Sequence, residues 1–297
     1  MAQGPWAVNE GAGPSLTAQR ACDYMLGREE KRTVIPYPQI DPEIVAVGPL
    51  RIRWYGLMYV LGFLAAYALI PRQPKARRIG LSREVVPDLI FFLAVGLVAG
   101  ARLGYLLFYQ AHNWTFYLEH PLEIIATWHG GMSFHGGLVG AVLAGWIFCR
   151  RRGLPFWAVA DCVVVTAPVG LGLGRIGNFI NGELFGRPTQ VPWAMVFPEG
   201  GAVPRHPSQL YEALFEGLVL FVILWLLSRK DRWDGFLVAA FLFFYGLFRF
   251  ILEYFREPDP QLGFVLATLT MGQLLCLGMM AIAAGLYAYG TRRYGVE

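Results

Sequence analysis

Four polar side chains interrupt an aromatic segment of this sequence at spacings of three or four residues, and they are Tyr245, Arg249, Glu253 and Arg256. Residues three or four apart lie on one face of a helix, so these side chains form a single polar stripe. A charged side chain inside an apolar segment costs about 3 kcal/mol on membrane-insertion scales, so a functional site is its default interpretation. The stripe therefore predicts a site for a charged ligand.

A second stripe of the same spacing is formed by Arg175, Asn178 and Asn181. A guanidinium group can donate two parallel hydrogen bonds to phosphate oxygens. Two arginines that face one cavity, Arg175 and Arg249, would therefore bind an anion, and a phosphate is the natural ligand.

Ion pairing gives the alternative interpretation of the same arginines. Arg249 can pair with Glu253, and Arg175 can pair with Glu183 or Glu212. The arginines would then connect neighbouring helices instead of binding a ligand.

The segment 128–140, WHGGMSFHGGLVG, places His135 among four glycines. A histidine can take a proton near neutral pH, so His135 is a candidate general base. A histidine at a helix end can equally act as a capping or hydrogen-bonding residue. The five histidines of the chain show no helical metal-ligand spacing, and we predict no metal site.

The composition indicates a membrane protein, because 56% of the 297 residues are hydrophobic and only 15% are charged, whereas soluble domains are about a quarter charged. The apolar residues fall in blocks near the roughly 17 to 25 residues that a spanning helix needs. We predict an all-α polytopic membrane protein with seven transmembrane helices over Trp54–Ile70, Val86–Tyr109, Met132–Cys149, Pro155–Ile176, Leu210–Leu227, Phe236–Phe255 and Gly263–Tyr289.

Lysine and arginine in the short loops predict the orientation of these spans. The loops around residues 71–84, 149–153 and 228–233 are basic, whereas residues 110–131 contain no Lys or Arg. The N-terminus is therefore expected outside and the C-terminus in the cytoplasm. Nearly every charge within a span then lies in the outer half of the membrane, where lipid headgroups supply the phosphates. The net charge of +4 reflects this bias and implies no nucleic-acid partner.

The remaining segments complete the expected organisation. Residues 1–33 are expected to form a poorly ordered extension, and residues 34–290 to form the membrane domain, with an external arm at 34–53 and a small external head at about 178–207. Residues 291–297 would be a cytoplasmic tail. Gly172, Gly174 and Gly177 fit a dinucleotide-binding pattern, but no strand precedes them, so we interpret them as a helix-packing surface.

Six segments of the chain resemble the prolipoprotein diacylglyceryl transferases of bacterial inner membranes, in order and between about residues 35 and 290. They are RWYGLMYVLGF (53–63), ARLGYLLFY (101–109), GGMSFHGGLVG (130–140), GLGRIGNFINGELFGR (172–187), RHPSQLYEALFEG (205–217) and FRFILEYFREPD (248–259).

The resemblance implies an enzyme that moves the diacylglyceryl group of phosphatidylglycerol to the lipobox cysteine of a preprolipoprotein and releases glycerol 1-phosphate. It implies an inner-membrane location, an active site towards the periplasm and no cofactor. His135, Arg175 and Arg249 would be catalytic, with His135 or an arginine–phosphate network accepting the thiol proton. The residues expected to bind phosphatidylglycerol are Arg175, Tyr55, Asn178, Asn181, Glu183, Glu212, Tyr245, Arg249 and Glu253.

Two other classes of protein fit part of the pattern. A transporter or flippase for an anionic lipid or solute would explain arginines within spans, but it would need polar residues along the whole path, and the inner halves of the spans are nearly all apolar. A lipid-binding scaffold would explain the anion site but not the histidine.

Overall fold

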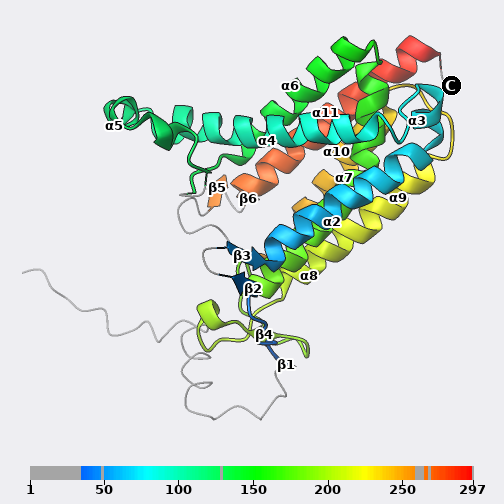
Figure 1. Cartoon of the computed structure of the whole chain (residues 1–297). Coiled ribbons are helices and arrows are strands. Elements are labelled where there is room, and N and C mark those ends of the chain that lie inside the picture. The colour runs from blue at the N-terminus through cyan, green and yellow to red at the C-terminus, as the bar shows by residue number, and fades with distance from the viewer. Residues whose placement is uncertain (1–34, 48–49, 128–129, 258–263, 267–268, 296–297) are drawn as a thin grey trace, which may run out of the picture.

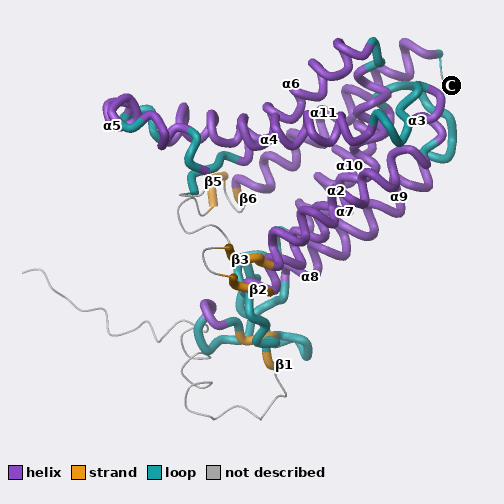
Figure 2. Tube along the Cα trace, viewed as in Figure 1, coloured by secondary structure: helices purple, strands orange, loops and turns teal. Residues whose placement is uncertain are grey.

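The computed structural model describes residues 35–47, 50–127, 130–257, 264–266 and 269–295, and it is mostly helical (Figures 1 and 2). The predicted extension at 1–33 and the start of the seventh predicted span at Gly263 lie outside the described residues. The helices are α2 (Trp54–Leu69), α3 (Pro74–Arg78), α4 (Val86–Tyr109), α5 (Trp114–Glu119), α6 (Phe134–Arg152), α7 (Phe156–Asn181), α8 (Ser208–Glu212), α9 (Leu220–Leu227), α10 (Phe236–Leu252) and α11 (Met271–Tyr294).

A π-helical segment, Ala213–Val219, joins α8 to α9, so that Ser208–Leu227 forms one rod. Short 3₁₀ turns cover Ile70–Arg72, Pro121–Ile124 and Pro198–Gly200. The sequence predicted a continuous helix over most of this rod and gave no sign of the π-helical segment.

The strands make three small sheets outside the helices. β1 (Ile35–Pro36) pairs in parallel with β4 (Met195–Val196). β2 (Glu43–Val47) and β3 (Leu50–Arg53) form an antiparallel hairpin directly before α2, and β5 (Phe264–Leu266) pairs with β6 (Leu269–Thr270) directly before α11. The expected arm at 34–53 is therefore built from strands that pair with each other and with residues near 195.

Each of the seven predicted spans contains a helix at the expected place. In the part of the chain that the structure describes, five helical rods are long and apolar enough to cross a membrane, namely Trp54–Arg72, Val86–Tyr109, Phe156–Asn181, Ser208–Leu227 and Met271–Tyr294. The apolar helix α10 is shorter, and α6 has four glycines and ends on three arginines, which lowers its hydropathy. α11 begins at Met271 because Thr270 and Gln273 form a capping box there.

Helix α7 lies in the middle of the bundle, beside α2 and the rod formed by α8 and α9 (Figure 1). A Cβ atom on Gly172 would lie 2.9 Å from the Cα of Gly217, and one on Gly177 would lie 2.8 Å from the ring of Tyr55. Only glycine permits these approaches. The interpretation of Gly172 and Gly177 as a packing surface is thus confirmed, whereas Gly174 has open space around it.

Helices α4 and α6 form a second closely packed pair. A Cβ atom on Gly140 would lie 2.8 Å from the Cα of Gly100, and one on Gly136 would lie 2.8 Å from the Cα of Gly104. The two backbones therefore touch along several turns, as in other membrane helix pairs with small residues at the interface.

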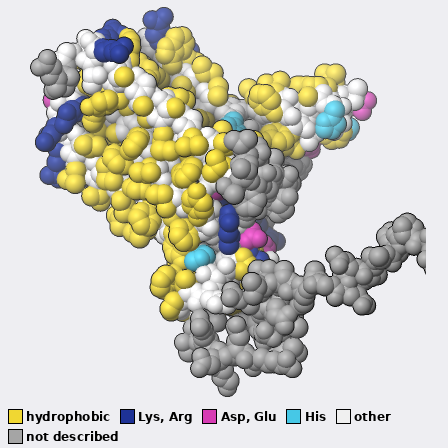
Figure 3. Space-filling model, turned by 180° about the vertical axis from the view of Figure 1, so that it is seen from behind, with side chains coloured by type: hydrophobic (Ala, Val, Ile, Leu, Met, Phe, Trp, Pro, Cys, Tyr) yellow, Lys and Arg dark blue, Asp and Glu magenta, His cyan; other side chains and the backbone are white. Residues whose placement is uncertain are grey.

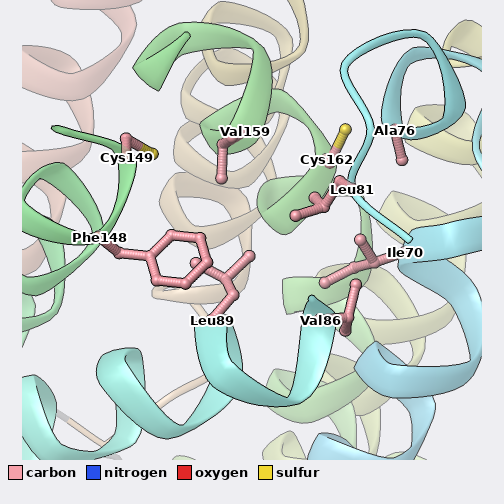
Figure 4. Close-up of a cluster of buried hydrophobic side chains, with 9 residues drawn as sticks. All are labelled: Ile70, Ala76, Leu81, Val86, Leu89, Phe148, Cys149, Val159 and Cys162. Atoms are coloured by element: carbon pink, nitrogen blue, oxygen red, sulfur yellow. The ribbon is translucent and has the colours of Figure 1, made fainter. Parts of the chain in front are cut away.

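One end of the α4–α6 pair is fixed to the rest of the molecule by a buried apolar cluster (Figure 4). Leu89 of α4 and Phe148 of α6 pack there with Val159 of α7 and Ile70 of the turn after α2. Between helices in a membrane such side chains stabilise the fold mainly through van der Waals packing.

The same end of the bundle holds a buried ion pair. The Nζ of Lys75 lies 2.5 Å from Oδ2 of Asp161, which is fully buried in α7. The Asp161 carboxylate also accepts hydrogen bonds from the backbone N–H groups of Gly235 and Val238, at 2.9 Å each. Asp161 therefore caps the first turn of α10 rather than its own helix.

Candidate active site

The two predicted arginines meet at a pair of buried glutamates. Glu212 and Glu216 are one helical turn apart on the rod, and their side chains are 1% and 0% exposed. The Nε of Arg175, on α7, lies 2.7 Å from Glu212 and its Nη2 lies 3.6 Å from Glu216. Arg249, on α10, places Nη1 2.9 Å from Glu212 and 3.6 Å from Glu216.

Two further charged groups border this pair. The Nη2 of Arg249 lies 3.0 Å from Glu253, which also accepts a hydrogen bond from the hydroxyl of Thr270 at 3.0 Å. Arg256 follows α10 and places Nη1 3.8 Å from Glu212. We call Arg175, Glu212, Glu216, Arg249, Glu253 and Arg256 the charge cluster.

The charge cluster contains three arginines and three glutamates, so its formal charge is zero. The arginines keep part of their surface accessible, because their side chains are 18% exposed at Arg175, 15% at Arg249 and 13% at Arg256. Both carboxylate oxygens of Glu216 are buried and have no hydrogen-bond partner among the described residues, so Glu216 is held by charge alone.

Both interpretations made from the sequence therefore find support in the geometry. The expected pairs Arg249–Glu253 and Arg175–Glu212 are present, so the arginines do connect helices. The arginines also converge from different helices on one point and keep part of their side chains exposed, which is compatible with an anion site. Glu183 is not a partner of Arg175 among the described contacts.

Glu183 instead belongs to a neighbouring polar group at the end of α7. Its Oε1 accepts hydrogen bonds from the amide groups of Asn178 at 2.8 Å and Asn181 at 3.1 Å. Its backbone carbonyl accepts a bond from Gln209, at 2.6 Å, just before Glu212 on the rod. The polar end of α7 is thereby fixed against the helix that carries the buried glutamates.

Two tyrosines complete the predicted set on these helices. Tyr55, in the first turn of α2, packs its ring against Gly177, close to Arg175 in α7. Tyr245 lies one turn before Arg249 in α10 and stacks on Phe241 with ring centroids 5.5 Å apart. Both rings therefore border the turns that present the arginines.

His135 makes no described contact with the charge cluster. It is an exposed residue of the first turn of α6, after the N-cap Ser133, whose Oγ accepts a hydrogen bond from the N–H of Gly136. Among the described contacts of its side chain is an edge contact with Phe134, and none joins it to Arg175 or Arg249. The structure thus brings together the arginines, asparagines and glutamates, but not the histidine.

Arg102 supports the turn in front of His135. Its buried guanidinium donates hydrogen bonds to the carbonyls of Glu123, Ile124, Gly130 and Gly131. These bonds satisfy carbonyls that no regular structure uses, so Arg102 fixes the loop between α5 and α6.

The segment 184–207 folds over the polar end of α7 with the arm. The hydroxyl of Tyr37 lies 2.6 Å and 2.9 Å from the carbonyls of Phe179 and Ile180 in the last turn of α7, and burial raises the pKa of Tyr37. A cavity of about 400 Å³ lies between the arm and Asn181, and it is lined by Asp41, Pro42, Glu43, Arg53 and Asn181. Hydrogen bonding from Arg51 lowers the pKa of Glu43 at its edge.

His206 is the second histidine of this region and lies just before the rod. Its Nδ1 is 3.2 Å from the hydroxyl of Tyr211, and its ring contacts Phe255 edge-on. Burial lowers the pKa of His206, which favours the neutral ring at pH 7.

Glu216 and Arg256 were not among the residues predicted to be catalytic or to bind phosphatidylglycerol. The four-residue spacing of Glu212 and Glu216 was a usable signal, because it places both carboxylates on one helix face. Arg256 belonged to the polar stripe that includes Arg249. Among the described residues no group of three or more His, Cys, Asp and Glu side chains could hold a metal ion.

Comparison with known proteins gives one consistent result. The family model described as "Prolipoprotein diacylglyceryl transferase" matches residues 42–289. A Geobacter sulfurreducens protein named phosphatidylglycerol–prolipoprotein diacylglyceryl transferase is 52% identical over 257 residues, which cover 86% of this chain and 98% of the relative. Proteins of the same name from Desulfotalea psychrophila and Azotobacter vinelandii are 53% and 50% identical and share 82% and 88% of this chain, with 90% and 98% of their own lengths covered. With a family match over most of its length and three such relatives, this chain belongs to the prolipoprotein diacylglyceryl transferase family.

Proposed function

We propose that this protein transfers the diacylglyceryl group of phosphatidylglycerol to the thiol of the lipobox cysteine of a preprolipoprotein. Family membership favours this transferase activity over transport of an anionic lipid. The observation that carries the proposal is the convergence of Arg175 and Arg249, from two helices, on the buried Glu212, while both arginine side chains stay partly exposed.

In the proposed setting seven helices cross the inner membrane of a bacterium, with the N-terminus outside and the C-terminus in the cytoplasm. Five rods of sufficient length and hydropathy support this arrangement. Arg78 and Asp161 lie at one end of the bundle and Arg175 at the other, because 14 residues of α7 span roughly 21 Å at 1.5 Å per residue. The basic end would face the cytoplasm and Arg175 the periplasmic side.

Residues 34–290 would then form the catalytic membrane domain, with the arm at 34–53 and the head at about 178–207 outside the bilayer. Figure 3 supports this division, because an apolar body separates basic side chains at one end from mixed charges and a histidine beside the head. Residues 291–297 would form a cytoplasmic tail.

The lipid phosphate would bind the exposed faces of Arg175 and Arg249. The glutamates neutralise and orient both guanidinium groups. A phosphodiester brings one further negative charge, so it would compete most easily with Glu216, the carboxylate held without hydrogen bonds. Donors placed where charge develops contribute about 10²- to 10³-fold to the rate each, and here the charge develops on the departing glycerol phosphate.

The reaction is a displacement at carbon. The sulfur of the lipobox cysteine forms a C–S bond to the phosphate-bearing carbon of the diacylglycerol part, and the bond from that carbon to the phosphate oxygen breaks, with its electron pair going to the oxygen. The products are a thioether and glycerol 1-phosphate. No cofactor is needed, since the leaving group is already a phosphate monoester.

The thiol must lose a proton, because the thiolate is the nucleophile. We assign His135 as the acceptor. Its exposed position at the start of α6 would leave it accessible to a peptide, while the arginines hold the lipid from the other side. The alternative acceptor is the arginine–phosphate network itself.

The other residues of the proposed binding set would orient the arginines and the glycerol hydroxyls. Asn178, Asn181 and Glu183 supply amide and carboxylate groups on the same side of α7 as Arg175, and Tyr55 and Tyr245 border them. The cavity beside Asn181 would receive polar parts of either substrate under the head. Glu212 and Glu253 would position Arg249.

The decisive experiment uses the purified full chain, phosphatidylglycerol and a peptide that contains a lipobox cysteine. We expect release of glycerol phosphate and a peptide heavier by one diacylglyceryl group. A peptide in which serine replaces the cysteine is the matched control and should remain unmodified. Absence of product with correctly folded protein would refute the proposed activity.

A further inference from the structure

A second cavity lies at the end of the bundle remote from Arg175. It measures about 390 Å³ and lies in the segment that joins α2 to α4, where Arg72, Arg77, Ser82 and Arg83 line it. The segment is anchored to α7 near Asp161, roughly 21 Å along the helix from Arg175. This cavity is therefore separate from the charge cluster.

The basic residues of this segment fall into two groups. Lys75 pairs with Asp161 at 2.5 Å and with Asp234 at 3.2 Å, and Arg78 pairs with Asp231 at 2.7 Å and with Asp234 at 3.0 Å. These two cations face α7 and the loop before α10, and their charge is compensated.

Arg72, Arg77 and Arg83 face the cavity instead. In the described part of the chain no carboxylate lies within 4.0 Å of their guanidinium nitrogens, and the nearby Glu84 is not their ion-pair partner. Arg72 donates to the carbonyl of Ala68, and the Nε of Arg77 donates to the carbonyl of Pro71 at 3.4 Å. A guanidinium has five N–H donors, so most donors around the cavity are free to bind a ligand.

Three uncompensated guanidinium groups around one concavity make a site for a phosphate-bearing anion. Its position favours a lipid over a soluble phosphate. The cavity lies in the segment that joins α2 to α4, and apolar side chains are exposed on both helices near this segment, since Tyr67 in the last turn of α2 is 42% exposed and Phe91 in the second turn of α4 is 66% exposed. These side chains would contact acyl chains below a bound headgroup.

The hydroxyl of Ser82 adds a neutral donor to the site. Its Oγ already accepts a hydrogen bond from the N–H of Glu84 at 3.3 Å, so the hydroxyl proton remains available to a phosphate oxygen. On the face in Figure 3, Lys and Arg side chains gather at this end beside the apolar body.

We propose that the cavity lined by Arg72, Arg77 and Arg83 binds the phosphate of an anionic phospholipid, at the opposite end of the bundle from the lipid that is transferred. The proposal requires neither His135 nor the charge cluster. A test of this proposal is therefore independent of the transferase activity.

The test measures lipid binding to the purified full chain in detergent by native mass spectrometry. The probe is phosphatidic acid, which lacks the glycerol headgroup, and phosphatidylcholine is the zwitterionic control. In the variant Arg72→Gln/Arg77→Gln/Arg83→Gln we expect one phosphatidic acid site to weaken at least tenfold, with phosphatidylcholine binding unchanged.

The matched control is Arg229→Gln/Lys230→Gln/Arg292→Gln, which removes the same charge from exposed positions of the same end outside the cavity. It should weaken binding less than threefold. An equal loss of phosphatidic acid affinity in both triple variants would indicate general charge attraction and would overturn the proposal of a specific site. If the first triple variant fails to fold, Arg83→Gln alone should still weaken binding about threefold, and an unchanged affinity would overturn the proposal.

A competition arm distinguishes the two sources of phosphate. Inorganic phosphate and glycerol phosphate at millimolar concentration should leave phosphatidic acid bound, because neither makes acyl contacts. Complete displacement by inorganic phosphate would assign the cavity to a soluble anion and refute the proposal that its ligand is a lipid.

Discussion

Replacement of Arg249 by glutamine separates the structural and catalytic roles of the charge cluster. Arg249 is the partner of three carboxylates, Glu212 at 2.9 Å, Glu253 at 3.0 Å and Glu216 at 3.6 Å. Arg249→Gln leaves three glutamates with two arginines, so the formal charge of the cluster changes from zero to −1. Both the folded state and the bound phosphate then meet an uncompensated negative charge.

The expected loss of stability follows from the burial of Arg249. Removal of one partner from a buried ion pair costs about 3–5 kcal/mol of stability, and Arg249 is only 15% exposed, so we expect a loss within that range. If Arg249 also holds the phosphate, the rate should fall about 10²- to 10³-fold, as for other lost oxyanion donors. That change equals about 2.7–4.1 kcal/mol of activation free energy.

A double-mutant cycle with Glu253→Gln decides between the roles. The variant Arg249→Gln/Glu253→Gln restores a formal charge of zero, and the glutamine carbonyl can still accept the hydrogen bond from Thr270. In the Glu253→Gln background we expect Arg249→Gln to cost much less stability, because the two sites couple. The 10²- to 10³-fold loss of rate should persist, since the phosphate has still lost its donor.

The assay is initial glycerol phosphate release from phosphatidylglycerol with a lipobox peptide, beside thermal unfolding in the same detergent. Glu253→Gln alone is the reference for both measurements. If the double variant regains the rate of that reference, Arg249 serves only to connect helices. Such a result would remove Arg249 from the phosphate site.

Three further predictions concern other parts of the fold. His135→Gln should abolish thioether formation in single-turnover assays while phosphatidylglycerol remains bound, and retained turnover would demote His135 to a positioning residue. Gly140→Val should destabilise the α4–α6 pair by about 1–3 kcal/mol in thermal unfolding, because its Cβ would lie 2.8 Å from the Cα of Gly100. Gly170→Ala, with open space around it, is the control and should not lower the unfolding midpoint. The lowered pKa of His206 means that the unfolded chain binds more protons, so stability should fall as the pH drops below about 6.5. His206→Gln should flatten that fall, and an unaltered pH profile would contradict the assignment.

Helix positions and the polar stripes followed from the sequence for a direct physical reason. The long apolar blocks and the 3.6-residue period are local properties, so α2, α4 and α7 begin within two residues of their predicted starts. The same period placed Arg249 and Glu253 on one face of α10, and their 3.0 Å contact confirms it.

Contacts between helices were harder to predict from the sequence. Arg175 had two candidate partners, Glu183 and Glu212, and only packing of α7 against the rod selects Glu212. The π-helical segment after Glu212 has no compositional signature, although it carries Glu216 into the same site. The capping box at Thr270 also shortened the last predicted span, since strands β5 and β6 precede it.

Helix α7 explains how residues so distant in sequence form one site. At one end Asp161 fixes the start of α10 through two backbone hydrogen bonds, and toward the other end Arg175 meets Arg249 of that helix across Glu212. Between them, Gly172 brings the rod within backbone contact. A side chain at Gly172 would move Glu212 away from α7, so this one glycine of the pattern that resembled a dinucleotide-binding loop sets the distance between Arg175 and Glu212. The proposed phosphate site therefore depends on Gly172 through helix packing, and the proposed ligand contact belongs to Arg175.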